Sequence, residues 1–207
     1  MNRKKIIGIP IKNLDKAMSR LSEVINLKDR KKLQVELVKN LVNCFKNEQN
    51  DIFLISKDRN VEDLSKQLEV NIFFSNNIGL NQEIYEFSSL FEKYYGWMIC
   101  HADLPYVTKH FAKTISQELD NNEILIAKSK DNGTPFIAGT KIFKNFEFGI
   151  KSFDKHIKYL SENKYKYSQI YSTEFTFELD DEDDLKKFMK NQPRWFKKIS
   201  FSSPDRI

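Results

Sequence analysis

Two periodicities of apolar residues alternate along the first half of the chain. Short, continuous apolar runs, which are typical of buried strands, are followed by stretches in which apolar residues recur every three or four positions, as on one face of a helix. In one such stretch Leu33, Leu37, Leu41 and Phe45 share a helical face. The pattern predicts strands over residues 5–11, 51–56, 71–75 and 97–100, a polar loop over residues 12–20, and helices over residues 28–45, 60–68, 80–94 and 108–119.

The second half of the chain has a less regular order. Strands are predicted over residues 123–127 and 136–142, on either side of the turn-forming segment 131–133, so that an antiparallel hairpin interrupts a parallel arrangement. A helix over residues 152–161, strands over residues 168–172 and 175–179, and a helix over residues 181–189 follow. Because strands and helices alternate, we predict an α/β protein with a three-layer, Rossmann-like mixed sheet.

Composition favours one folded domain. The 207 residues are 40% hydrophobic and 30% charged, enough for one sizeable core and short for two. We therefore expect a domain over residues 1–190 and a C-terminal extension over residues 191–207. The net charge of +5 comes from 34 basic and 29 acidic residues that are dispersed among one another. That is a poor footprint for nucleic acid, and no nucleic-acid partner is expected, whereas a nucleotide suits the modest positive bias.

The two cysteines and the N-terminus bear on the compartment. Cys44 lies in a helical pattern and Cys100 in a strand pattern, which favours two buried free thiols and a reducing environment. Only a few apolar residues stand between Lys5 and Lys12, too few for a signal peptide or a membrane span. We expect a cytoplasmic protein without a membrane partner, and a homodimer is left open.

Two acidic segments are the main candidates for chemistry. Residues 97–104 carry an apolar strand directly into Asp103, and Leu104-Pro105 then turns the backbone before a helix. Ligands of α/β sheets usually bind at this edge, beyond the carboxyl ends of the strands. Asp180 follows a second apolar run in the same way. If the two carboxylates meet in space, they can share one divalent cation.

Several polar segments are candidates for binding anions and bases. Lys12 and Arg20 lie in the loop after the first strand and could hold phosphates, although an ordinary solvated loop is somewhat more common. Gly79 and Asn81 could approach the edge of a nucleobase, although glycine often precedes a helix. Ser152 begins a helix after Gly149 and could bind phosphate there, or could simply cap the helix.

The positions of two histidines and the absence of known motifs exclude several kinds of catalysis. His156 is more often structural than catalytic in such a position, and His101 is expected to point away from Asp103. The chain has neither the Gly-x-Gly-x-x-Gly motif of dinucleotide-binding proteins nor a P-loop. It also has no constellation that suggests a covalent nucleophile, so the chemistry would rest on a metal ion and on charge.

Taken together, these segments resemble the 2-phospho-L-lactate guanylyltransferase family of deazaflavin coenzyme biosynthesis along nearly the whole chain. The similarity is carried by Ile9-Pro10-Ile11-Lys12 with Ser19-Arg20, Gly79-Leu80-Asn81, Ala102-Asp103-Leu104-Pro105, Gly133-Thr134, Phe148-Gly149-x-x-Ser152-Phe153-x-x-His156, and Asp180. It implies the nucleotide-diphospho-sugar transferase fold, GTP as donor, Mg²⁺ held by Asp103 and Asp180, and catalysis by these acids with Arg20. It also implies triphosphate binding by Lys12 and Arg20, base contacts from Gly79 and Asn81, and acceptor binding by Thr134, Gly149 and Ser152.

Three positions depart from the pattern that the chain resembles. Met18 replaces a lysine beside the phosphate-binding segment, Pro135 replaces an asparagine after Thr134, and Glu178 replaces an aspartate two positions before Asp180. The acceptor therefore stays open among 2-phospho-L-lactate, phosphoenolpyruvate and 3-phosphoglycerate. The alternatives are a related nucleotidyltransferase, such as a molybdopterin guanylyltransferase, and a basic RNA-binding protein or non-catalytic regulator on the same fold.

Overall fold

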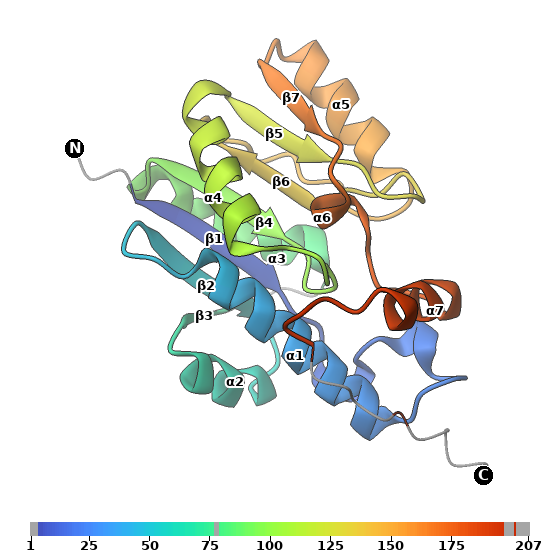
Figure 1. Cartoon of the computed structure of the whole chain (residues 1–207). Helices are drawn as coiled ribbons and strands as arrows, with labels where there is room; N and C mark the ends of the chain where they lie inside the picture. Colours follow the sequence, from blue (N-terminus) through green and yellow to red (C-terminus); the bar gives the residue numbers. More distant parts are fainter. Residues whose placement is uncertain (1–3, 77–78, 197–200, 202–207) are drawn as a thin grey trace.

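A seven-stranded mixed sheet forms the centre of the computed structural model, which describes residues 4–76, 79–196 and 201 (Figure 1). The strands follow the order β3-β2-β1-β4-β6-β5-β7. Their bounds are β1 Lys5–Pro10, β2 Asn50–Ser56, β3 Asn71–Phe74, β4 Gly96–Cys100, β5 Ile124–Ala127, β6 Phe136–Gly139 and β7 Tyr167–Ile170. β6 runs antiparallel to both of its neighbours, and every other pair is parallel. The predicted α/β class and the hairpin are confirmed.

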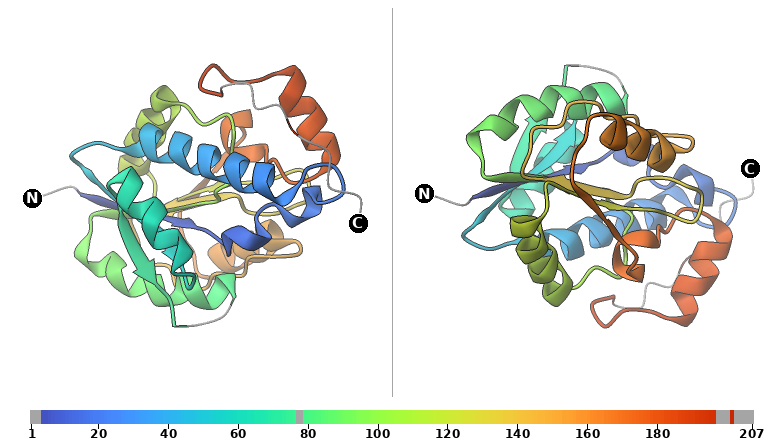
Figure 2. Two further views of the ribbon diagram at one scale, coloured as in Figure 1. Left: turned by 90° about the horizontal axis from the view of Figure 1, so that it is seen from below. Right: turned by 90° about the horizontal axis from the view of Figure 1, so that it is seen from above.

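Helices cover both faces of the sheet and give the three layers (Figure 2). α1 (Leu27–Phe45), α2 (Asn60–Leu68) and α4 (Lys109–Glu118) pack in one core cluster, while α3 (Leu80–Phe87), the 3₁₀ helix η3 (Ser88–Lys93) and α5 (Ser152–Glu162) pack in the other. β4 supplies both clusters in alternation, with Met98 on the first side and Trp97 on the second. The sequence shows this strand as a continuous apolar run because both of its faces are buried.

A third, smaller core lies at the carboxyl edge of the sheet. Here α7 (Glu182–Lys190) packs through Leu185 and Phe188 against the start of α1 and against Leu21 of the 3₁₀ helix η2 (Ser19–Leu21). The predicted polar loop therefore contains two 3₁₀ turns, η1 (Leu14–Lys16), which packs beside α1, and η2, which packs against α7. The short helices η4 (Leu119–Asn121) and α6 (Thr173–Thr176) complete the structure.

The predicted strand over residues 175–179 is wrong. α6 takes its first residues, and the ring of Phe175 packs on that of Phe136 with centroids 4.3 Å apart. The chain then leaves the sheet and crosses its carboxyl edge, where the Leu179 N–H donates to the carbonyl of Asp103 at 2.9 Å. The apolar run is therefore explained by packing, and the crossing places the segment 178–181 beside Asp103.

The end of the described chain packs against the same edge. The Trp195 indole N–H donates to the carbonyl of Pro105 at 2.9 Å, and the rings of Phe196 and Phe188 lie 4.8 Å apart. Residues 191–196 thus support the turn that follows Asp103. No helix within residues 4–76 and 79–196 is long and apolar enough to cross a membrane.

Candidate functional site

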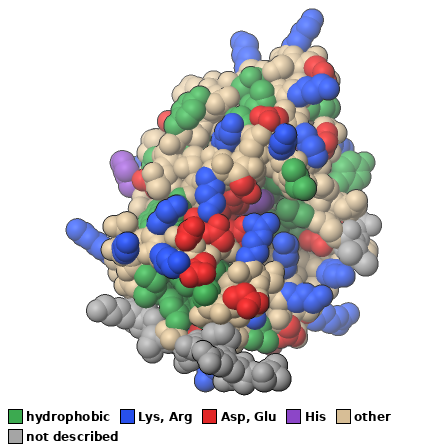
Figure 3. All heavy atoms as spheres, turned by 90° about the vertical axis from the view of Figure 1, so that its right-hand side faces the viewer, with side chains coloured by type: hydrophobic (Ala, Val, Ile, Leu, Met, Phe, Trp, Pro, Cys, Tyr) green, Lys and Arg blue, Asp and Glu red, His purple; other side chains and the backbone are tan. Residues whose placement is uncertain are grey.

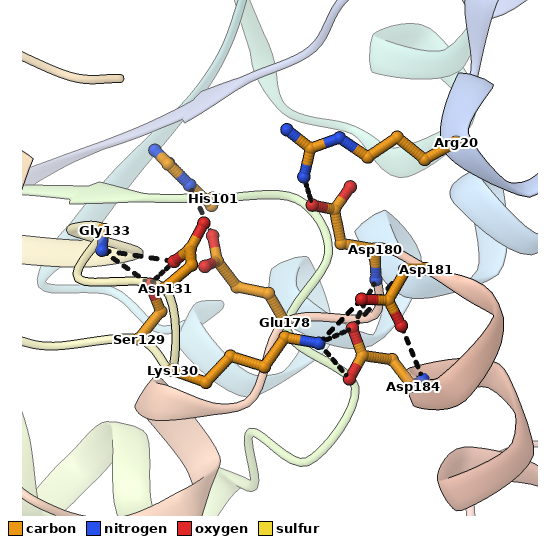
Figure 4. Close-up of polar contacts among 10 residues, drawn as sticks. All are labelled: Arg20, His101, Ser129, Lys130, Asp131, Gly133, Glu178, Asp180, Asp181 and Asp184. Carbon is orange, nitrogen blue, oxygen red and sulfur yellow. Dashed lines mark hydrogen bonds and ion pairs between the residues drawn. The ribbon is translucent and has the colours of Figure 1, made fainter. Parts of the chain in front are cut away.

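The polar groups of the candidate site gather at the carboxyl edge of the sheet, where His101, Glu178 and Asp180 lie close to one another (Figure 4). β4 ends at Cys100, and the next residues carry His101 and Asp103 over the sheet edge. Glu178 and Asp180 approach from the crossing segment, and the β5–β6 loop approaches from a third direction. Acidic side chains occupy the middle of this face in Figure 3, with lysines and arginines around them.

Three side chains form a compact donor cluster. His101, Asp103 and Glu178 each offer one ligand atom, and these atoms all lie within 4.8 Å of one another. The Nδ1 atom of His101 lies 3.0 Å from Oε1 of Glu178. Within the described residues, Oδ1 of Asp103 and Nε2 of His101 are buried and have no hydrogen-bond partner. The expectation that His101 points away from Asp103 is wrong, since both residues face the same cluster.

Electrostatics disfavour negative charge in this donor cluster. Burial raises the pKa of Asp103 to about 7, and the charges of Glu178 and Asp180 raise it further against the opposing effect of His101. Burial alone would lower the pKa of His101, but its hydrogen bond to Glu178 and the charge of that residue raise it above the ordinary value. A cation placed among these carboxylates would relieve their repulsion.

Asp180 faces a different partner. Its carboxylate forms an ion pair with the guanidinium of Arg20, whose side chain is 68% exposed. Burial raises the pKa of Asp180, while Arg20 opposes that rise. The structure thus brings Asp103, Asp180 and Arg20 to one site, as the sequence predicts. Metal binding by Asp180 stays a prediction.

The acids after Asp180 hold the crossing segment in place. Asp181 caps α7 and accepts a hydrogen bond from the Asp184 N–H at 2.9 Å, while the fully buried Asp184 side chain returns to the N-cap backbone. Lys130 of the β5–β6 loop donates to both carboxylates, at 2.9 Å and 2.7 Å. The hydrogen bond from Lys130 holds the pKa of Asp181 at about 2. These acids therefore fasten the loop to α7.

The β5–β6 loop carries one more acid toward the site. Ser129 Oγ donates to Asp131 at 2.5 Å, which lowers the pKa of that carboxylate, and the Gly133 N–H donates to it at 3.2 Å. A Cβ at Gly133 would lie 2.6 Å from Ser129 Oγ, so a larger residue there would displace the hydroxyl that donates to Asp131. The sequence pattern predicts only a turn at Asp131. The turn in fact brings the charge of Asp131 close to Arg20 and Asp180.

The predicted acceptor-binding residues also meet. Thr134 Oγ1 lies 2.9 Å from His156 Nδ1 and accepts from Ser152 Oγ at 3.2 Å, and the Ser152 N–H donates to the carbonyl of Gly149 at 3.0 Å. Both hydroxyl side chains are buried, so the exposed part of this group is the backbone at Gly149, where φ is 117°. Ser152 does not cap α5, since it is the first helical residue and Lys151 precedes it in the left-handed region.

His156 is a neutral structural link in this group. Its Nε2 accepts from the Glu147 N–H at 2.9 Å, so Nδ1 must carry the proton and donate to Thr134. Burial lowers the pKa of His156 to about 4. The structural interpretation of His156 is thus supported, and the residue fixes the Thr134 hydroxyl.

The predicted nucleotide-binding residues lie around the same edge. Lys12 is exposed, and its charge acts on His101. Gly79 precedes α3 with φ 108°. Asn81 holds the backbone of Phe148 with two hydrogen bonds, donating to its carbonyl at 3.2 Å and accepting from its N–H at 2.7 Å. Asn81 therefore joins α3 to the backbone at Phe148, and its contact with a base stays a prediction.

Comparisons with known proteins agree with this geometry. Residues 4–202 match the sequence model of the family described as "Guanylyl transferase CofC like". The chain is 26% identical to the 2-phospho-L-lactate guanylyltransferase of Methanocaldococcus infernus over 178 residues, 86% of this chain and 81% of that protein. It is 29% identical to the protein of the same name from Methanosphaera stadtmanae over 170 residues, 77% of this chain and 72% of that protein.

A solved structure bears out the fold. A candidate nucleotide-diphospho-sugar transferase from Desulfovibrio desulfuricans G20 superposes with a TM-score of 0.79 at 14% identity. The match covers 92% of this chain and 88% of the other. At this identity the likeness establishes the architecture, and the predicted fold type is confirmed.

Proposed function

Since the chain belongs to the family of CofC-like guanylyl transferases, we propose that it transfers GMP from GTP to 2-phospho-L-lactate, or to the related acids phosphoenolpyruvate or 3-phosphoglycerate, in coenzyme F-420 biosynthesis. The observation that carries the proposal is the convergence of Asp103, Glu178 and Asp180 on one edge of the sheet with Arg20 beside them. Mutually repelling carboxylates next to an exposed guanidinium suit a nucleoside triphosphate and a divalent cation.

The carboxylates of Asp103 and Asp180, with that of Glu178, would hold Mg²⁺. The unpartnered Oδ1 of Asp103 and the raised pKa values of both aspartates fit a cation at this place. When bound, the ion supplies charge neutralisation at the phosphates of the nucleotide.

Arg20 and Lys12 would bind the triphosphate. Arg20 has five N–H donors in a planar fork, and its contact with Asp180 leaves others free for phosphate oxygens. The fork thereby holds the leaving pyrophosphate in a fixed relation to the carboxylates. Gly79 and Asn81 would face the base, with Asn81 also supporting the segment that receives the acceptor.

The acceptor would bind at Gly149 and Ser152, with Thr134 behind them. A phosphate oxygen of the acceptor attacks the α-phosphorus of GTP, a new P–O bond forms, and the bond to the bridging oxygen breaks as pyrophosphate departs with the electron pair. The protein contributes mainly by holding attacker and leaving group in line and by stabilising charge. Neither step requires a covalent enzyme intermediate.

A pyrophosphate-release assay tests the proposal. Purified protein would be given GTP, ATP or CTP with each of the three acceptors and Mg²⁺, and release should be greatest with GTP and one phospho-acid. Asp103→Asn should abolish the release, while Asp183→Asn, which changes an exposed acid on α7, should leave it intact. A folded protein that releases no pyrophosphate with any pair would instead support a non-catalytic role on this fold.

A further inference from the structure

His101 lies in the donor cluster and contacts a carboxylate, which is unusual for a histidine that only fills the core. Its Nδ1 lies 3.0 Å from Glu178 Oε1, and its ring lies over Phe148 with centroids 5.4 Å apart. Phe148 contacts the ring at an interplanar angle of 45°, and Glu178 approaches the imidazole from the acidic side of the site (Figure 4). The imidazole is thus fixed with a nitrogen among the carboxylates.

The three donor atoms lie close enough together to contact one metal ion after small side-chain movements. With metal–ligand distances of about 2.1 Å, adjacent ligands of an octahedral ion lie about 3.0 Å apart and opposite ones about 4.2 Å apart. The observed His101–Glu178 contact has the adjacent separation, and all three donor atoms lie within 4.8 Å of one another. The buried Oδ1 of Asp103, which has no partner in the described residues, provides a further oxygen at the cluster.

The chemistry of the donors indicates which ion they select. Mg²⁺ strongly prefers oxygen ligands, whereas first-row transition ions also accept an imidazole nitrogen. Among these ions Mn²⁺ suits a set that contains two carboxylates, and it accepts one nitrogen ligand more readily than Mg²⁺ does. A site with Asp103 and Glu178 alone would lack this preference.

We propose that His101 is a ligand of the divalent cation, together with Asp103 and Glu178, and that the site therefore prefers Mn²⁺ to Mg²⁺. The proposal rests on the proposed function only in placing a cation at these carboxylates. Nδ1 coordinates the ion in place of its contact with Glu178, and Glu178 turns its carboxylate to the same ion.

The test uses Mn²⁺ alone, added to the full chain without nucleotide. Pulsed electron paramagnetic resonance of bound Mn²⁺ should show modulation from a directly coordinated ¹⁴N nucleus, and labelling the histidines with ¹⁵N should convert it to the ¹⁵N pattern. His101→Gln should remove the nitrogen modulation. His110→Gln, which changes the exposed histidine on α4, should keep it.

Equilibrium binding gives a second readout. In His101→Gln the ratio of the Mg²⁺ and Mn²⁺ dissociation constants should fall at least about ten-fold relative to the unchanged protein and to His110→Gln. If His101→Gln fails to fold, the ¹⁵N-labelled wild type still decides, because its signal requires no substitution. Far-ultraviolet circular dichroism identifies that case.

Three outcomes would overturn the inference. These are no nitrogen modulation in the wild type, modulation that survives in His101→Gln, or the same ratio of Mg²⁺ and Mn²⁺ dissociation constants in His101→Gln and His110→Gln. Failure of the proposed function is recognised separately. A protein that releases pyrophosphate but shows no nitrogen ligand keeps the function and loses the inference. A protein that binds Mn²⁺ through nitrogen but transfers no nucleotide keeps the inference and loses the proposed function.

Discussion

Arg20 forms an ion pair with Asp180 across 160 residues of sequence. The contact joins η2, in the loop after β1, to the segment that crosses the sheet edge before α7. Because the Arg20 side chain is largely exposed, the pair alone contributes little to stability. The ion pair instead fixes the position of the guanidinium, whose side chain remains 68% exposed.

Replacing Arg20 should therefore affect nucleotide binding more than folding. Arg20→Gln is expected to lower kcat/KM for GTP about 10- to 100-fold, since charge-assisted hydrogen bonds contribute about 1.5–3 kcal/mol. Arg20→Lys should recover only part of the loss because a lysine has no planar fork. Arg59→Gln, an exposed change beside α2, is the control. Unchanged GTP kinetics in Arg20→Gln would remove this residue from the triphosphate site.

Asp103→Asn should stabilise the metal-free protein while abolishing its activity. The pKa of Asp103 is about 7 in the folded state against an ordinary 3.8, so the folded chain keeps a proton between these values that the unfolded chain releases. Stability of the wild type is consequently lost as pH rises from 3.8 through 7. At pH 8 the variant should gain roughly 1–3 kcal/mol in the free energy of unfolding, and the gain should shrink toward pH 4.

Chemical denaturation with chelator present, at pH 5 and pH 8, measures this difference. Asp183→Asn serves as the control, because its carboxylate is 79% exposed and should show no such pH dependence. Activity of Asp103→Asn should fall by at least about 100-fold. Equal stability of the variant and the wild type at both pH values would mean that burial and the neighbouring charges do not raise the pKa of Asp103.

Lys130 should be important for stability although half of it is exposed. Lys130→Met leaves the fully buried Asp184 carboxylate without its counterion, and we expect a loss of about 1–3 kcal/mol in the free energy of unfolding. Lys186→Met removes a lysine that pairs only with exposed acids on α7, and should cost less than about 0.5 kcal/mol. Urea denaturation of both variants compares the two lysines directly, and equal losses would contradict the anchoring role.

His156 should make the protein sensitive to mild acid. Its pKa is about 4 in the folded state against an ordinary 6.5. Between these pH values the histidine is protonated in the unfolded chain and neutral in the folded chain. The stability that the neutral imidazole provides is complete above pH 6.5 and is lost as pH falls toward 4, by about 3 kcal/mol in total. His156→Gln removes this component.

The measurement is the free energy of unfolding of the wild type and of His156→Gln from pH 7 to pH 4.5. The two curves should converge as pH falls, because only the wild type loses the histidine contribution. His110→Gln, which changes an exposed histidine, should follow the wild type throughout. Parallel curves for wild type and His156→Gln would show that the imidazole titrates normally.

Local patterns predict much of this fold but little of its long-range pairing. β4 and the β5–β6 hairpin are visible because burial on both faces and turn residues leave a mark in the sequence. The contact between Lys130 and Asp184 cannot be predicted in this way, because each residue lies in a charged segment whose pattern is typical of solvent-exposed chain. The role of His101 is missed for the same reason, because its partner Glu178 lies 77 residues away.

The wrongly predicted strand over residues 175–179 shows a second limit of local patterns. Its alternating apolar residues satisfy the strand pattern, but Phe175 packs in the first core and Leu179 in the third. Periodicity reports that both side chains are buried and cannot report that they are buried in different places. The resulting crossing is what brings Glu178 and Asp180 to Asp103.

The antiparallel strand β6 separates the predicted acceptor-binding residues from the predicted nucleotide-binding residues along the chain. Thr134, Gly149, Ser152 and His156 all belong to one continuous stretch around β6, whereas Arg20 and Asp103 come from the parallel half. A lineage could therefore change its phospho-acid by altering residues 134–156, while Lys130 and Asp131 keep the contacts of the preceding loop with α7 and Arg20. Chimeras between relatives, cut at these two boundaries, would carry substrate choice from one parent and donor choice from the other.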